Sequence, residues 1–98
     1  MKTFKDLVFI THPFRSGKQA KMFFDNNYGV SVIRSKMPNS NIHFSYTSND
    51  NEWEVAILQG TEDNWNLCYN TKITDDVIGY LTNDQVTEIM KQVQLLNK

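Results

Sequence analysis

Cysteine and histidine are nearly absent from this sequence. Its 98 residues include one cysteine, Cys68, and two histidines, His12 and His43. One thiol cannot form an internal disulfide, and three scattered residues match no zinc-ligand spacing. A reactive Cys-His pair would need a thiol beside a cation and open to substrate, whereas Cys68 stands between Leu67 and Tyr69 as an ordinary strand residue would. We therefore expect no metal, no cofactor and no catalytic residue.

Long apolar runs are also missing. No run approaches the roughly 20 residues that cross a bilayer, and the first residues lack the apolar stretch of a signal peptide. Together with the single cysteine, this favours a soluble protein of a reducing cytoplasm that does not act on membranes. Hydrophobic residues at 40% and aromatic residues at 12% are typical of globular chains. The length indicates one domain over residues 1–98.

The first half of the chain has few acidic residues and the second half has few basic residues, although the whole chain carries a net charge of −1. Residues 1–50 hold seven cations and three anions, whereas residues 51–98 hold three cations and eight anions. The near-neutral total argues against general affinity for nucleic acid. The division has two interpretations: attraction between the halves within one fold, or a surface with a basic and an acidic pole.

Alternating apolar and polar residues predict a series of short strands up to about residue 70. The run 7–10 is apolar on both sides, as in a strand buried on two faces. Further strands are expected around 21–24, 30–34, 42–46, 52–58 and 65–69. Their short links favour an antiparallel meander, because parallel pairs need long crossovers. The sequence therefore predicts an α+β fold with about five to six short strands.

One or two C-terminal helices, packed on one face of the sheet, are predicted after the strands. Thr74 can cap a short helix through Ile78 that Gly79 ends. The segment 82–85 fits a capping box, with Leu81 able to pack on the first apolar residue after the cap. The apolar residues that follow lie at helical spacing and predict one stripe against the sheet: Val86, Ile89, Met90, Val93 and Leu96.

The stretch Phe23–Val32, FFDNNYGVSV, is interpreted as a hairpin turn, and its polar residues need no ligand to explain them. Two registers are open. A loop of residues 27–29 uses Gly29 as the left-handed residue and pairs Phe24 near Val32, whereas a two-residue Asn26-Asn27 turn places Phe24 opposite Gly29. Both leave open whether Tyr28 packs back on the sheet or is presented to a partner.

The segment 15–19 contains Gly-Lys, as a P-loop does, but it lacks the first glycine and the Ser or Thr that binds magnesium. The cations around the hairpin base are better candidates for contact with phosphates: Arg15, Lys18, Lys21, Arg34 and Lys36. Phe23 could stack on a base if it faces outward. A solvated strand edge that resists association is the alternative interpretation of this cluster.

The order of an N-terminal strand, the hairpin segment NNYGVSV, the strand EWEVAIL and the stretch TKITDDVIGYLTNDQVTEIM resembles a set of small proteins encoded by bacteriophages and prophages. The similarity runs over most of the chain and is clearest at 28–32 and 73–82. No activity is established for that set, so the resemblance implies a phage setting and transfers no catalytic residue. Because small phage accessory proteins often bind a host protein, it also favours a non-enzymatic binder.

Two functions are therefore expected as alternatives. The first is a cytoplasmic phage accessory protein that binds a host or phage protein, such as a defence factor, through exposed aromatics: Tyr28, Trp65 and Tyr80. A homodimer through an unprotected strand edge is a variant of it. The second is nucleic-acid binding through the five cations at the hairpin base, which low salt should strengthen.

Overall fold

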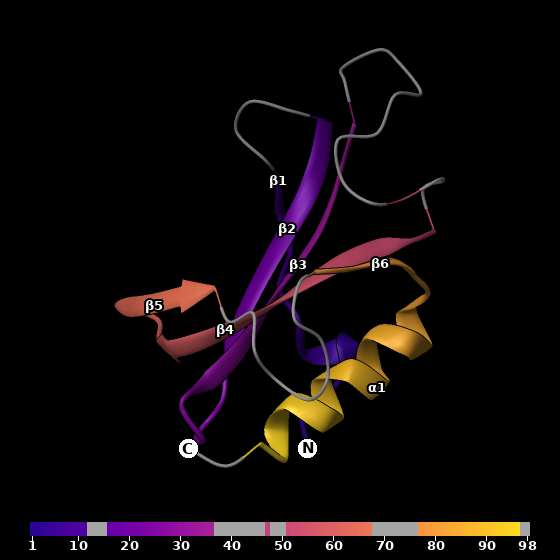
Figure 1. Cartoon of the computed structure of the whole chain (residues 1–98). Helices are drawn as coiled ribbons and strands as arrows, with labels where there is room; N and C mark the ends of the chain where they lie inside the picture. The colour runs from indigo at the N-terminus through magenta and orange to yellow at the C-terminus, as the bar shows by residue number, and fades with distance from the viewer. Residues whose placement is uncertain (12–15, 37–46, 48–50, 68–76, 97–98) are drawn as a thin grey trace.

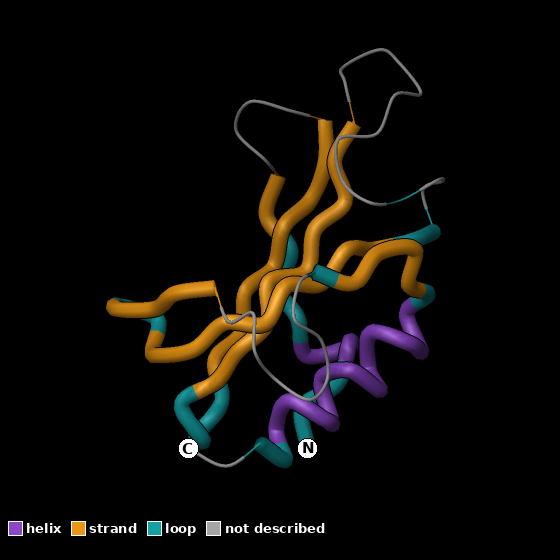
Figure 2. Tube along the Cα trace, in the orientation of Figure 1, coloured by secondary structure: helices purple, strands orange, loops and turns teal. Residues whose placement is uncertain are grey.

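A computed structural model describes residues 1–11, 16–36, 47, 51–67 and 77–96. In this part of the chain one α-helix lies against one face of a six-stranded antiparallel sheet, as Figures 1 and 2 show. The elements are η1, a 3-10 turn (Phe4–Asp6), β1 (Ile10–Thr11), β2 (Ser16–Phe23), β3 (Tyr28–Lys36), β4 (Trp53–Thr61), β5 (Asn64–Leu67), β6 (Ile78–Leu81) and α1 (Asn83–Gln94). The strand order is β1-β2-β3-β4-β5, and β6 also pairs with β4. The α+β prediction and its antiparallel meander are confirmed.

The core fills the space between the sheet and α1. Alternate residues of β2, β3 and β4 are buried on the covered face: Ala20, Val30, Val32, Trp53, Val55 and Ile57. The helix contributes Val86, Met90 and Val93, each with no exposed surface, which confirms the predicted apolar stripe. Burying one such aliphatic side chain stabilises a fold by about 1.5–3 kcal/mol. This shared core fixes which face of each central strand points away from water.

Local signals start α1 at the predicted residue. The Thr82 hydroxyl accepts a hydrogen bond from the Gln85 backbone N–H at 3.3 Å, and the Thr82 N–H donates to Gln85 Oε1 at 2.9 Å. These two bonds form the predicted capping box and satisfy a donor that a helix start leaves free. Leu81, just before the cap, is buried in the same core cluster as Val86.

The β2–β3 hairpin uses neither of the two predicted registers. Phe23 pairs with Gly29, and the Phe24 N–H donates to the Tyr28 carbonyl at 2.8 Å, so the loop consists of residues 25–27. Asn27, with φ 70°, supplies the left-handed residue that was expected at Gly29. Asparagine tolerates this conformation, and three-residue loops commonly end in it.

Gly29 is instead required for a close approach between strands. A Cβ atom there would lie 2.5 Å from the Met22 carbonyl oxygen and 2.8 Å from the Phe23 ring. Its backbone φ is not in the left-handed region. Gly29 therefore allows β2 and β3 to pack closely at this point. It is not the residue that reverses the chain.

Asn26 ties the hairpin loop to the far end of α1. Its amide Nδ2 donates to the carbonyl oxygens of Val93 at 2.8 Å and Leu96 at 3.0 Å, and its Oδ1 accepts from the Tyr28 N–H at 3.3 Å. The last carbonyls of a helix have no partner within the helix. A polar residue of the turn thus caps α1 from a distant part of the sequence.

Replacing Asn26 by aspartate should lower the free energy of unfolding by about 2 kcal/mol. The substitution keeps the shape but removes both donors, and it places a negative charge at the negative end of the helix dipole. Urea denaturation of the variant measures the change. Asp25→Asn, at the exposed neighbouring position, is the control and should change stability by less than about 0.5 kcal/mol. Equal effects of the two substitutions would contradict the capping role.

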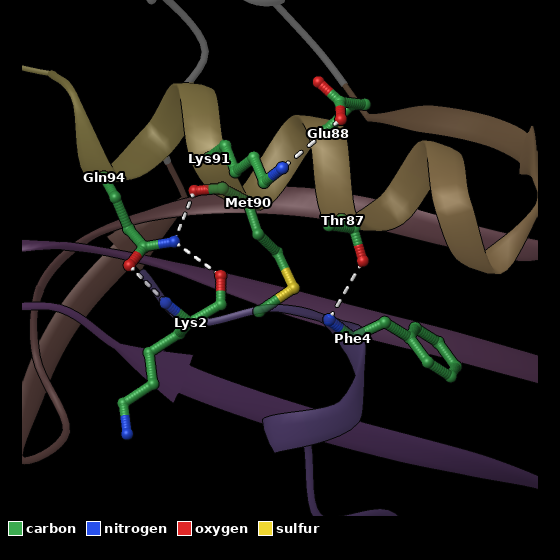
Figure 3. A network of polar contacts seen from close by, with 7 residues as sticks. All are labelled: Lys2, Phe4, Thr87, Glu88, Met90, Lys91 and Gln94. Carbon is green, nitrogen blue, oxygen red and sulfur yellow. Dashed lines mark hydrogen bonds and ion pairs between the residues drawn. The ribbon is translucent and has the colours of Figure 1, made fainter.

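The N-terminal segment is clamped along α1, as Figure 3 shows. The Gln94 side chain exchanges two hydrogen bonds with the Lys2 backbone, both at 2.8 Å, and also donates to the Met90 carbonyl at 3.0 Å. The Phe4 N–H donates to the Thr87 hydroxyl at 3.1 Å. These contacts hold η1 against the helix and so fix where the chain enters the edge of the sheet.

The predicted short helix ending at Gly79 is wrong in its last residues. Ile78 and Gly79 belong to β6, because the strand pairs Ile78 with Val55 and Leu81 with Trp53. Residues 68–76, which include Cys68, lie outside the described part of the chain, as do Arg15 and the strand expected at 42–46. Pairing with the long strand β4 overrides the local helix signal at 78–79, since tertiary context routinely overrides propensity.

Candidate functional site

The first strand of the sheet presents apolar side chains to solvent. From Leu7 to Ile10 the chain alternates: Leu7 is buried and Phe9 packs against the core, whereas Val8 is 78% exposed and Ile10 is 61% exposed. Alternation of this kind is typical of an extended strand with one covered face. The prediction that this run is buried on two faces is therefore wrong.

This strand is also an edge. β1 ends the strand order, and among the described elements it packs only against β2. Natural edges are usually protected by lysine, proline or a bulge, because an unpaired edge is a template for another strand. No charged residue and no proline occurs between Leu7 and Thr11. The edge, with apolar Ile10 exposed in β1 and apolar Val8 exposed just before it, thus lacks the common protections.

Tyr80 stands at the opposite edge, in β6. It is 58% exposed and has φ 58°, a left-handed conformation that costs a non-glycine residue roughly 1–2 kcal/mol. Trp53 pairs with Leu81 and Val55 pairs with Ile78, so β6 advances three residues where β4 advances two. Tyr80 lies in the resulting β-bulge. Strained backbone of this kind concentrates at functional sites. Of the three aromatic candidates, Tyr80 is the most exposed.

The other two aromatic candidates are half-buried. Tyr28 packs against the core cluster, which answers the question raised by the hairpin. Trp65, on β5, lies 6.5 Å from Phe23 between ring centroids, and the Lys21 ammonium lies 4.8 Å from its ring centroid. Cation–π contacts contribute about 0.5–1 kcal/mol at exposed sites. Both rings are therefore engaged within the chain.

Of the five basic candidates, the structure places the side chains of three, and these do not share one face of the sheet. Lys18 and Arg34 are register partners and share the face of the sheet that carries the core. Lys21 pairs with Ser31, one residue out of phase, and so points to the opposite face toward Trp65. Lys36 is the last residue of β3, and its side chain is not described. Arg15 lies outside the described residues. The expectation that Lys21 and Arg34 meet at the hairpin base is wrong.

Arg34 instead joins an aromatic cluster that no sequence signal indicated. Its guanidinium lies 4.1 Å from the ring centroid of Trp53, which also contacts Phe9 at 4.6 Å and Phe4 at 5.5 Å. The Trp53 Nε1–H donates to Asn83 Oδ1 at 2.8 Å. Four separate segments contribute these side chains, so only the tertiary structure assembles them.

The described residues contain neither a candidate metal site nor a candidate membrane-spanning helix. No group of three or more His, Cys, Asp or Glu side chains there is arranged to hold a metal ion. No helix among them has the length and apolar character needed to span a membrane. The candidate surfaces are accordingly the β1 edge, the Tyr80 bulge and the cluster around Trp53.

Comparison with known proteins yields no relative. A scan against protein-family models gives no match, and neither does a search of curated proteins or of solved structures. The resemblance to phage-encoded proteins therefore stays a prediction.

Proposed function

We propose that this chain is a phage accessory protein that binds a host or phage protein without catalysis and works in the cytoplasm of the host cell. The proposal rests on the β1 edge, where Ile10 in the strand and Val8 just before it are exposed. Among the described elements, β1 has no neighbour on its outer side. The phage setting rests on the sequence resemblance. Action on a defence factor is one form that such binding would take.

The mode of binding that this edge favours is strand addition. An extended segment of a partner can continue the sheet through its own main chain, while pockets for alternate side chains provide specificity. Val8 and Ile10 project on the same side, so a partner strand with apolar residues at alternate positions would bury both. The partner is then an extended apolar segment of another protein.

A second copy of this chain fits the edge less well. The extended run from Leu7 to Thr11 spans only about 16 Å. Pairing two such runs would bury far less than the roughly 1,200 Å² typical of a stable interface. A different protein can add contacts beyond the strand, including contacts to the basic side chains that β2 and β3 carry.

The test is affinity capture from host lysate with a double variant, Val8→Lys together with Ile10→Lys. Lysine on an edge is the usual protection against strand addition, so the double variant should lose at least about 90% of any partner that the wild type captures at stoichiometric level. Leu95→Lys is the matched control, since it places lysine at another apolar position, 68% exposed, on α1. It should capture the partner as the wild type does.

Three outcomes would contradict the proposal in different ways. If the wild type captures no protein at stoichiometric level, the binding function is wrong. If the double variant captures as much as the wild type but Tyr80→Ala does not, the partner binds the bulge and the β1 edge is the wrong surface. If light scattering shows a wild-type dimer that the double variant converts to monomer, the occupant is a second copy.

A further inference from the structure

A cleft beside the Trp53 cluster is distinct from the β1 edge. It has a volume of about 620 Å³ and lies between the N-terminal segment, the ends of β2 and β3, and the first turn of α1. Ligand clefts commonly have volumes of about 300–1,000 Å³. Its size therefore suits a small molecule of the size of a nucleotide.

The floor of the cleft is rigid. Trp53 is only 5% exposed, its indole N–H is bound by Asn83, and Phe9 packs on its ring. The Arg34 guanidinium lies over the same ring at 4.1 Å from its centroid. An arginine held against an aromatic face keeps its planar donors in one orientation, which suits two-point recognition of a phosphate or carboxylate.

A second cation faces the same cleft. Lys18 lies directly opposite Arg34 in the β2–β3 ladder, so the two side chains leave the sheet on one face. Directly opposed like charges destabilise a sheet, and Cβ atoms at such positions are about 5 Å apart. Within the described part of the chain, Lys18 forms no ion pair or hydrogen bond. An anion between these two side chains would contact both of them.

Asp84 opposes this attraction. It belongs to the first turn of α1 and lines the same cleft as the two cations. Its carboxylate lowers the potential that an anion would meet, whereas the positive end of the helix dipole raises it. Removing the Asp84 charge should therefore strengthen the binding of an anion in the cleft. If the two cations are only solvated and bind no anion, the same substitution should have no such effect.

We propose that this cleft binds a phosphate group carried by a ligand the size of a nucleotide. Lys18 and Arg34 contact the phosphate, and the half-buried rings of Phe4 and Phe9 form an apolar wall for the rest of the ligand. No P-loop is involved, because the anion is held by side chains of a sheet rather than by a glycine-rich backbone. The ligand is bound, not transformed.

The indole N–H signals in ¹⁵N-resolved NMR spectra report on this site directly. The chain has two tryptophans, and Trp53 lies in the cleft while Trp65 lies at the other end of the sheet. Titration with adenosine monophosphate at millimolar concentration should shift the Trp53 signal and leave the Trp65 signal in place. Inorganic phosphate should shift it with lower affinity, and adenosine should not shift it.

Variants then separate a site from general charge attraction. Lys18→Ala should weaken the affinity for adenosine monophosphate about tenfold, a loss expected for one charge-assisted contact. Asp84→Asn should strengthen it about threefold or more. Lys21→Ala, a lysine on the opposite face, is the matched control and should leave the affinity unchanged.

Several results would overturn the proposal. A Trp53 signal that does not respond to phosphate or adenosine monophosphate removes the site. Equal weakening by Lys18→Ala and Lys21→Ala reduces it to general attraction between opposite charges. Tight binding of a short oligothymidylate that depends on both lysines would replace the small ligand by a nucleic-acid strand that follows the basic strands.

Discussion

Replacing Trp53 by alanine should lower the free energy of unfolding by about 3–5 kcal/mol, which is the range for large aromatic residues in cores. The ring is 5% exposed and is packed by Phe4 and Phe9. Its loss leaves a cavity and takes away the hydrogen-bond donor to Asn83. Because small domains are stable by only about 5–15 kcal/mol, the variant should be close to unfolded at physiological temperature. Chemical denaturation followed by circular dichroism measures the change.

Trp65→Ala is the matched control. This second tryptophan is half-buried near the β4–β5 turn, where it contacts Phe23 and Lys21. Its removal leaves no enclosed cavity, so the cost should be about 1 kcal/mol. A cost for Trp65 as large as that for Trp53 would show that the face of the sheet away from α1 holds an equally important core.

Replacing Gly60 by alanine should cost about 3 kcal/mol, which is the upper end for strained backbone in regions that only glycine populates freely. Gly60 has φ 126°, and a Cβ atom there would overlap the Asn64 carbonyl oxygen and lie 2.9 Å from Trp65 Cα. Both contacts are to the backbone of β5, so no rotamer change can relieve them. The β4–β5 hairpin must open or shift.

Hydrogen exchange distinguishes a local loss from a global one. Amides of β5 should exchange much faster in Gly60→Ala, and those of β2 and β3 should change less, because local openings occur below the free energy of global unfolding. Thr61→Ala, at the exposed next residue, should leave exchange in β5 nearly unchanged. Unchanged protection of β5 in Gly60→Ala would contradict the steric argument.

The two proposed surfaces meet in residues 8–10, which lead into β1, but use opposite sides of this segment. Val8 and Ile10 project to solvent, whereas Phe9 packs inward against Trp53. The clamp between Gln94 and the Lys2 backbone holds the start of the chain against α1 (Figure 3). Substitutions at Val8 and Ile10 therefore leave the cleft residues in place, and Lys18→Ala leaves the apolar edge intact, so the two functions can be tested separately.

Local chemistry is what the sequence predicted well. The capping box at Thr82 and Gln85 and the apolar stripe of α1 depend only on residues within a few positions of one another. The strand pattern from Trp53 to Ile57 likewise follows from alternation alone, and its buried face is the predicted one. These features could be read from the chain because their physical causes are close in sequence.

The register of the β2–β3 hairpin could not be predicted, because the local sequence allows more than one loop length. With Asn26-Asn27 as a two-residue turn, Lys21 and Arg34 would share a face, but the observed three-residue loop shifts the pairing by one residue. A shift of one residue moves every side chain of a strand to the other face. The loop is selected in part by Asn26, whose amide bonds to the end of α1, a contact across 67 residues of sequence for Val93.

The sequence by itself thus determined the local elements: the strands, the helix and its cap, and the apolar stripe by which the helix packs on the sheet. Only the tertiary structure decided which strand is an edge, which cations share a face and which aromatic rings meet. An edge strand and a central strand can carry the same residues, because their difference lies in whether another part of the chain pairs beside them. For that reason Val8 and Ile10, read from sequence as core, became the candidate binding surface.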